Sequence, residues 1–332
     1  MKVLITGGAG FIGSQLGHYL HKLGYKVVLL DNLSFGYKDN LTINNETFGE
    51  FILNDIRSDS FINYLKDVDT VFHLAGIAPL PINQIDPCNA YNNNVAGTAN
   101  VLEACRKAKV SKIIFASTSA VYENNIKFPF EENDKINPTL IYSLTKKHAE
   151  ELVQSYIKSY DMDITTLRFF NVYGPHHDFR RKSPPLIAYI IKCLMTNEVP
   201  LLHSDGLQKR DYVNVADVCR MCQVAMTRIA SKNQTFNVAS NSVISMNEIY
   251  NKISTIMKSD IKPKFRDPKL LWDKYTSLTE GFAIDESLIT KETNKFSQGS
   301  YDKAKQLLNW EPKISFDDGI LETVNHAIKS GL

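Results

Sequence analysis

The sequence has 332 residues, of which 43% are apolar and 22% charged, an ordinary balance for a folded protein with a large core. Its 38 basic and 36 acidic side chains leave a net charge of +2, so no global positive field predicts binding to nucleic acid or to a membrane surface. No stretch approaches the roughly 20 apolar residues that span a bilayer, and glycines interrupt the first apolar run, unlike the layout of a signal peptide.

The first half of the chain alternates short strand-like runs with helical patterns, which is typical of βαβ units and a parallel sheet. We expect strands at residues 2–6, 26–31, 50–54, 70–74, 112–117 and 164–169. We expect helices between them at residues 12–23, 93–108 and 142–160. The last helix carries apolar side chains at helical spacing, so one of its faces should be buried, against the sheet or against a second subunit.

The first strand turns into a helix through Gly7, Gly10 and Gly13. Glycine lets a backbone turn tightly and approach a pyrophosphate, whose charge the helix N-terminus then holds. The pattern predicts a dinucleotide site that also includes Phe11 and Ile12.

Acidic residues end the next two strands. A carboxylate at Asp31 can accept hydrogen bonds from the ribose hydroxyls of a dinucleotide and repel a 2′-phosphate. Because Asn32 follows it rather than an arginine, we expect NAD rather than NADP. Asp55 and Ile56 follow the third strand, where they could contact the adenine, although a helix N-cap is an equally simple role for Asp55.

Small residues end the fourth strand. Leu74, Ala75 and Gly76 would let a cofactor pass close above the sheet, so we assign them to its site. His73 lies in a buried strand, and a hydrogen-bonded core histidine is a better interpretation than a catalytic one. We assign Asn94, on the following helix, to the cofactor site as a supporting structural residue.

The catalytic candidates follow the fifth strand. The hydroxyls of Ser117, Thr118 and Ser119 should lie at the carboxyl edge of the sheet, where ligands bind in such folds; we assign Ser117 to the cofactor and Ser119 to the substrate. Tyr142 and Lys146 share one helix face. A free phenol has a pKa of about 10, and we expect the Lys146 ammonium and a positive nicotinamide to lower the pKa of Tyr142 toward neutrality. Such a pair suits removal of an alcohol proton while a hydride leaves its carbon.

The character of the chain changes after Gly174. Residues 176–185 are polar, basic and broken by prolines, which predicts a loop, and a helix should follow at 186–195. Residues 204–206 should turn, and residues 235–239 should return to the sheet as a strand. The five cysteines are scattered, and the pair at 219 and 222 lacks partner ligands, so we expect reduced thiols, no metal site and a cytoplasmic location.

These patterns predict an α/β fold, a Rossmann doubly wound parallel sheet with a smaller C-terminal substrate-binding subdomain. The expected division gives residues 1–172 to an NAD-binding domain, to which 211–258 return. It gives residues 173–210 and 259–332 to a subdomain that binds a nucleotide sugar.

The chain resembles the extended branch of the short-chain dehydrogenase/reductase family, the nucleotide-sugar epimerases and dehydratases. The matching stretches run from residue 2 to residue 312 in the family's order: TGGAGFIG, HLAG, NNVAGTANVLEA, ASTSAVY, YSLTK, LRFFNVYGP, QKRDYVNVADV and LLNWEP. The resemblance implies that Thr118, Tyr142 and Lys146 are the catalytic set, and that Tyr142 and Lys146 also contact NAD. It further implies a homodimer through the helices at 93–108 and 142–160.

The resemblance also implies substrate contacts. Asn171 and Arg210 would contact the diphosphate, and Asp302 a ribose. Three further cations, Arg180, Arg181 and Lys182, precede two prolines where common 4-epimerases have a different loop. Guanidinium groups bind oxyanions bidentately, so we expect this cluster to bind the diphosphate or an anionic substituent of the sugar. The segment 269–295 replaces a short link of the family and could reshape the sugar pocket.

Departures from the family pattern narrow the reaction. The dehydratases follow the catalytic threonine with an aspartate and a glutamate, where this chain has Ser119 and Ala120. We therefore expect C4 epimerisation of an NDP-hexose, with UDP as the expected nucleotide, through a 4-keto sugar. A dehydratase or 4-keto reductase is the alternative, and a catalytically silent NAD-binding regulator a distant one. Glu123 replaces a glycine of the family, as a solvated loop residue or a substitute acid/base.

Overall fold

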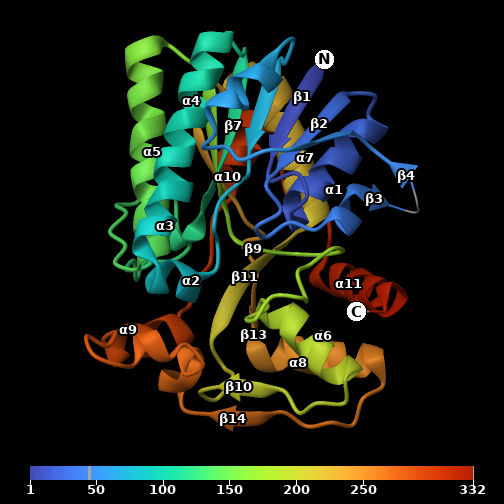
Figure 1. The fold of residues 1–332 in the computed structure, drawn as a ribbon. Helices are drawn as coiled ribbons and strands as arrows, with labels where there is room; N and C mark the ends of the chain where they lie inside the picture. Colours follow the sequence, from blue (N-terminus) through green and yellow to red (C-terminus); the bar gives the residue numbers. More distant parts are fainter. Residues whose placement is uncertain (44–45, 332) are drawn as a thin grey trace.

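A seven-stranded parallel sheet forms the centre of the computed structural model, which describes residues 1–43 and 46–331 (Figure 1). Across the sheet the strands run in the order β12 (Thr235–Val238), β8 (Ile164–Phe169), β7 (Lys112–Thr118), β6 (Thr70–His73), β1 (Lys2–Thr6), β2 (Lys26–Asp31) and β5 (Glu50–Leu53). All six neighbouring pairs are parallel. The strand order reverses direction next to β1, so the carboxyl edge there is the position where such sheets bind ligands.

Helices cover both faces of this sheet, which confirms the doubly wound prediction (Figure 1). One face packs under α1 (Phe11–Lys22), α7 (Val215–Thr227) and α10 (Asp302–Leu308). The other packs under η2 (Asp59–Leu65), α4 (Gly97–Ala108) and α5 (Ile141–Tyr160). All strands of this sheet except the edge strand β5 are buried on both sides along almost their whole length, as their apolar sequences require.

Most of the predicted elements of this half are confirmed to within one residue, and residues 235–238 return to the sheet beside β8. The predicted helix at 93–108 begins earlier, with the π-helical turn η3 (Asn92–Ala96) leading into α4. Short elements connect the rest: η1 (Lys38–Leu41), β3 (Thr42–Ile43), β4 (Glu46–Thr47), α2 (Leu80–Ile85), α3 (Pro87–Tyr91), η4 (Ser119–Tyr122) and η5 (Ile229–Ser231).

A second group of elements lies below the carboxyl edge of the sheet (Figure 1). It contains two small sheets, β13 (Val243–Ser245) with β11 (Lys209–Asn214) and β9 (Asn171–Tyr173), and β10 (Leu201–His203) with β14 (Lys264–Arg266). Their apolar core is shared with α6 (Leu186–Met195), α8 (Met246–Met257) and α11 (Phe316–Ser330). The expected division placed residues 246–257 with the large sheet and 302–308 with the smaller part. The packing differs, because α8 joins the lower core and α10 the upper one.

The segment 269–295, which replaces a short link of the family, folds into short elements that no periodic sequence pattern indicates. It contains η6 (Pro268–Trp272), η7 (Thr276–Leu278) and α9 (Glu286–Thr293), which together we call the α9 segment, residues 268–293. An apolar cluster joins Trp272, Tyr275 and Ile289 of this segment to Leu140, and Leu80 of α2 packs against it. The α9 segment therefore lies beneath α2 at the side of the molecule opposite α11 (Figure 1).

Two further expectations concern composition. Cys219 and Cys222 lie one turn apart in α7, both are buried, and neither forms a disulfide. Burial raises the pKa of both thiols, so they are unreactive core residues. Within the described ranges, no helix combines the length and the apolar character needed to cross a membrane.

Candidate active site

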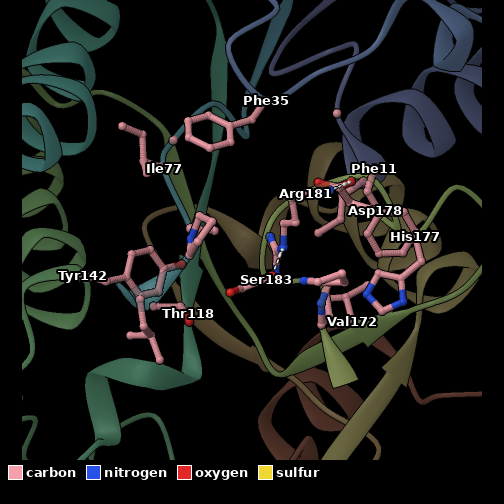
Figure 2. A pocket seen from close by; sticks show the side chains of 18 of the residues that line it. Phe11, Phe35, Ile77, Thr118, Tyr142, Val172, His177, Asp178, Arg181 and Ser183 are labelled. Atoms are coloured by element: carbon pink, nitrogen blue, oxygen red, sulfur yellow. Dashed lines mark hydrogen bonds between the residues drawn. The ribbon is translucent and has the colours of Figure 1, made fainter. Parts of the chain in front are cut away.

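A cavity of about 790 Å³ lies between the carboxyl edge of the large sheet and the lower group of elements. The glycine turn, Asp31, Thr118, Tyr142 and Lys146 all line it. Figure 2 shows Tyr142 and Thr118 on one side of the cavity, with Arg181, Ser183 and His177 across from them. Residues that are far apart in the sequence therefore share one cavity.

The glycine turn has the shape that a pyrophosphate requires. Gly7 has a φ of +72°, which favours glycine, and its carbonyl oxygen accepts a hydrogen bond from the Gly10 amide at 3.0 Å. A Cβ on Gly13 would lie 2.1 Å from the Gly7 oxygen, so only glycine fits there. Gly10 caps α1 without any side-chain hydrogen bond, which leaves the first amides of the helix free for an anion. Phe11 and Ile12 line the cavity beside them.

The acid at the end of β2 is in place for a ribose. Asp31 accepts hydrogen bonds from the amides of Ala9, at 3.1 Å, and Leu33, at 2.7 Å. Burial raises its pKa, against the effect of these two amides, and the carboxylate lines the cavity. Asn32 also lines it, with its side chain donating to Asp55 at 2.8 Å. The donor and acceptor set therefore fits a dinucleotide whose adenosine ribose lies over β2.

Asp55 itself lies outside the cavity lining, although Ile56 is part of it. Its carboxylate pairs with Arg57, with 2.7 Å between the charged atoms. The hydrogen bond from Arg57 holds the pKa of Asp55 well below its ordinary value, despite partial burial. Asp55 therefore organises the loop after β5, with Asn32 and Arg57 between it and the cavity.

The fourth strand ends as expected. Leu74, Ala75 and Gly76 line the cavity. Asn94, 2% exposed, accepts a hydrogen bond from the Ile77 amide at 2.8 Å and donates to the Ile77 carbonyl at 3.1 Å, which fixes the loop after this strand. Asn94 also lines the cavity, and its assignment to the cofactor site stays a prediction.

His73 is confirmed as a core residue. It is 1% exposed, and its ring nitrogens lie 2.9 Å from the Thr6 hydroxyl and 3.0 Å from the Thr98 hydroxyl. Burial lowers its pKa to about 3, so the ring is neutral at pH 7.

Thr118 and Tyr142 form the reactive end of the cavity (Figure 2). The Thr118 hydroxyl accepts a hydrogen bond from the Ala120 amide at 3.1 Å, so its own proton is free to be donated. Burial raises the pKa of Tyr142, whereas a hydrogen bond with Thr118 and the charge of Arg181 lower it. Burial outweighs both effects, and the cation whose charge lowers this pKa here is Arg181, so the expected lowering by Lys146 and a bound nicotinamide stays a prediction.

Lys146 lies in the wall of the cavity, beside β7. Its ammonium donates to the Ala116 carbonyl at 2.6 Å and lies 4.4 Å from the centre of the Phe115 ring. Burial lowers its pKa to about 8, with the nearby Glu150 carboxylate opposing that effect. It lines the cavity one helical turn after Tyr142, in reach of a cofactor lying over β7.

Ser117 has a second task besides lining the cavity. Its hydroxyl donates to the Glu150 carboxylate at 2.5 Å, and Arg168 of β8 pairs with the same carboxylate at 2.7 Å. Both charged side chains are buried. The network ties α5, which carries the catalytic candidates, to two strands of the sheet.

The predicted substrate residues divide into those inside the cavity and those outside it. Asn171, Arg181 and Arg210 line it. Asn171 donates to the Asp211 carbonyl at 2.7 Å. Arg210 donates to the Glu292 carboxylate at 3.2 Å and to the Glu292 backbone carbonyl at 2.5 Å. The cavity lining does not include the other predicted substrate residues, Ser119, Arg180, Lys182 and Asp302.

Two of the three loop cations turn away from the cavity for clear reasons. Arg180 pairs with Asp39 at 2.8 Å and stacks on the Tyr37 ring at 3.5 Å. The Lys182 ammonium lies 4.9 Å from the centre of the Tyr275 ring, on the α9 segment. Side chains of consecutive residues in an irregular loop point in different directions, so the sequence alone could not select the inward one.

Ser119 and Asp302 have local roles. Ser119 begins the η4 turn directly after Thr118. Asp302 lies in the first turn of α10, where its carboxylate accepts a hydrogen bond from Ser300 at 2.9 Å. The contact with Ser300 accounts for the Asp302 side chain without a ligand.

Glu123 has a role that neither interpretation covered. It is 7% exposed, and its carboxylate accepts hydrogen bonds from the Leu140 amide at 3.0 Å, the Thr139 amide at 3.2 Å and the Thr139 hydroxyl. It lies outside the cavity lining. Glu123 therefore fixes the backbone that enters α5, two residues before Tyr142.

Sequence reasoning missed several cavity residues. His177 is 6% exposed, its Nδ1 has no hydrogen-bond partner among the described residues, and its ring stacks at 4.9 Å from that of Phe11. The α9 segment contributes Trp272, Lys274 and Glu292, which could not be assigned because the segment has no periodic pattern. The polar residues of the HHD run at 176–178 were the one available signal, and they were assigned only to a loop.

A doubly wound sheet, a glycine turn at its switch point, and a tyrosine–lysine pair beside a threonine define a short-chain dehydrogenase/reductase of the extended type. The model of the "NAD dependent epimerase/dehydratase family" matches residues 3–239. The chain belongs to this family, and its cofactor is NAD.

Known relatives agree over the whole chain. A putative UDP-glucose 4-epimerase of Methanocaldococcus jannaschii is 34% identical over 97% of both chains. A UDP-glucuronate 4-epimerase of Thermodesulfobacterium geofontis is 29% identical over 97% of this chain and 94% of its own. The solved UDP-glucose 4-epimerase of Thermotoga maritima, with UDP-glucose, has a TM-score of 0.87 and 30% identity over 100% of both chains.

Proposed function

We propose that this protein is an NAD-dependent UDP-sugar 4-epimerase, which inverts C4 of a hexose through a 4-keto sugar. The observation that carries the proposal is the Tyr142 phenol beside Thr118 in a cavity that also holds the glycine turn. The names of the similar proteins support the nucleotide and the carbon atom.

The side chains have complementary tasks in this reaction. The Thr118 hydroxyl, whose oxygen is occupied by the Ala120 amide, donates to the sugar oxygen or to Tyr142. Tyr142 takes the proton of the C4 hydroxyl and returns it once the keto sugar has turned over. The glycine turn, Asp31 and Lys146 would hold NAD, which would supply the acceptor and donor of the C4 hydride. The Lys146 ammonium, hydrogen-bonded to the Ala116 carbonyl, would lie below the nicotinamide ring and contact it.

Dehydration needs an additional acid and base beside the same carbon chain. The positions after Thr118 are Ser119, which lies outside the cavity lining, and Ala120, which cannot exchange a proton. Glu123 is occupied by the backbone of residues 139–140. These placements support epimerisation over dehydration.

Oligomeric state is part of the proposal. We expect a homodimer through α4 and α5, which lie side by side at the edge of the molecule (Figure 1). Sedimentation of the purified protein would test it, because a monomeric mass at micromolar concentration contradicts the interface.

The test of the function is incubation of the purified protein with a panel of UDP- and dTDP-sugars in deuterated buffer, without added NAD. We expect a new isomer of unchanged mass from a UDP-hexose or UDP-hexuronate. A product lighter by one water would replace the proposal with dehydration. Consumption of added NADH with a product heavier by two hydrogens would replace it with reduction.

A further inference from the structure

Four arginines line the cavity, and they differ in what neutralises them. Arg57 pairs with Asp55, Arg210 with Glu292, and Arg266 with Asp273, at 2.7, 3.2 and 2.8 Å. The fourth is Arg181, which has no carboxylate within ion-pair distance among the described residues. It is therefore the arginine of this cavity that has no ion-pair partner among the described residues.

Arg181 is nevertheless held in a defined pose. Its Nε donates to the Ser183 carbonyl at 2.7 Å, and its backbone amide lies 3.3 Å from Asp178. The same oxygen of Asp178 accepts hydrogen bonds from the Arg180 amide, at 3.0 Å, and the Tyr37 hydroxyl, at 3.2 Å. In the described part of the chain no group accepts a hydrogen bond from the two terminal guanidinium nitrogens of Arg181. Both nitrogens are therefore available to a ligand.

Arg181 faces the reactive end of the cavity. Figure 2 shows its guanidinium across from Tyr142 and Thr118, with Ser183 beside it. The charges of Arg181 and Tyr142 affect each other's pKa, so the two groups lie within electrostatic reach. Burial lowers the pKa of the Arg181 guanidinium, and an anionic ligand would stabilise this partly buried cation.

The surroundings on that side are also positive. Lys182 and Lys274 are held together, since the ammonium of Lys274 donates to the Lys182 carbonyl at 3.0 Å. Burial and the charge of Arg266 lower the pKa of Lys274, with Lys182 adding to the effect. Lys182 belongs to the loop 176–185, Lys274 to the α9 segment and Arg266 to β14, and of the three Lys274 and Arg266 line the cavity.

We propose that Arg181 binds a carboxylate carried by the hexose, so that the preferred substrate is a UDP-hexuronate or a similarly acidic UDP-sugar. The inference rests on the proposed function for one point, that the reacting carbon lies at Tyr142. A planar fork with two free terminal nitrogens matches a carboxylate in bidentate geometry. We assign the diphosphate to Arg210 of β11, as the resemblance implies.

The experiment compares UDP-glucuronate with UDP-glucose, in binding by calorimetry and in turnover, for the NAD-containing protein. We expect the unaltered protein to prefer UDP-glucuronate. Arg181→Gln should lose about 10- to 100-fold in affinity and kcat/KM for UDP-glucuronate and change less than about threefold for UDP-glucose. Arg181→Lys, which keeps the charge and loses the fork, should fall between them.

Arg180→Gln is the matched control, because the Arg180 side chain pairs with Asp39 outside the cavity. This change should leave binding and turnover of both UDP-sugars unaffected. Equal losses of Arg181→Gln for both sugars and for UDP alone would assign Arg181 to the diphosphate and overturn the inference. Absence of any preference for UDP-glucuronate in the unaltered protein would also overturn it. If neither sugar is isomerised but the binding preference depends on Arg181, the proposed reaction fails and the inference stands.

Discussion

The Arg210 guanidinium donates to both the carboxylate and the backbone carbonyl of Glu292, which lies 82 positions later in the chain. Burial would raise the pKa of Glu292, but the charges of Lys295 and Arg210 hold it below its ordinary value. This pair attaches the end of the α9 segment to β11 inside the cavity.

Removing the Glu292 charge should destabilise the protein. Glu292→Gln leaves Arg210 and Lys295 without their carboxylate in a largely buried place, so we expect the free energy of unfolding to fall by about 1–3 kcal/mol. Glu286→Gln in the same helix is the control, because its ion pair with Lys269 is exposed and should change stability by less than about 0.5 kcal/mol. Equal effects of the two changes in urea unfolding would contradict the role of Glu292.

Loss of the Tyr142 hydroxyl should abolish most turnover without unfolding the protein. Tyr142→Phe should lower kcat by about 10²- to 10⁴-fold, the range for a general acid or base. Tyr160→Phe, at the exposed end of the same helix, should leave kcat unchanged. Measurement of initial rates with the preferred UDP-sugar, beside thermal melting curves, separates catalysis from folding. Undiminished rates would exclude Tyr142 as the base.

Glu123 should affect stability and not the acid–base chemistry. Glu123→Ala removes the acceptor of the buried Leu140 amide and of the Thr139 amide, so we expect a loss of about 1–3 kcal/mol in the free energy of unfolding. We also expect a lower kcat, because the backbone before Tyr142 loosens, with the shape of the pH–rate profile retained. If the variant instead loses one limb of that profile, Glu123 takes part in proton transfer.

Buried histidines should make the protein sensitive to acid. Burial lowers the pKa of His73 to about 3, and the same cause acts on others near the cavity: about 3 for His177, and about 4 for His176 and His203. The unfolded chain binds protons below about pH 6.5, whereas the folded chain does not, so the free energy of unfolding should fall as the pH falls from about 6.5 to 4. The contribution of a single such group is about 2 kcal/mol at about pH 5.

The pH dependence can be assigned with one variant. His73→Gln lowers stability at every pH but should make its decrease between pH 6.5 and 4 shallower. His21→Gln, on the exposed surface of α1, should leave the slope unchanged. Urea unfolding at several pH values measures both; an unaltered slope for His73→Gln would show that this ring is not held neutral.

Local patterns sufficed for the large sheet and for one end of the site. The runs at 2–6, 26–31 and 164–169 match their strands at both ends, because they are apolar, rich in β-branched residues and bounded by turns. Gly7 and Gly13 could be assigned because their requirement is steric and local. Tyr142 and Lys146 follow from helical spacing, which needs no tertiary information.

The remaining site depends on contacts between distant segments. Nothing in the sequence near Arg210 indicates that Glu292 will pair with it, and nothing near Glu123 indicates residues 139–140. Of three consecutive cations, only Arg181 enters the cavity, because partners on other elements draw the other two away. Short 3₁₀ turns such as those of the α9 segment leave no periodic signal, so its part in the cavity was not predictable.

The α9 segment joins the rest of the molecule through an apolar cluster, the buried Arg210–Glu292 ion pair and a few polar contacts such as Arg266–Asp273, and it lines part of the cavity. Tyr142, Lys146 and Thr118 lie on α5 and β7, outside the α9 segment. We therefore expect that the α9 segment can be replaced while the reaction is conserved. Grafting residues 268–293 into a relative that acts on neutral sugars is therefore a route to new sugar selectivity within one scaffold.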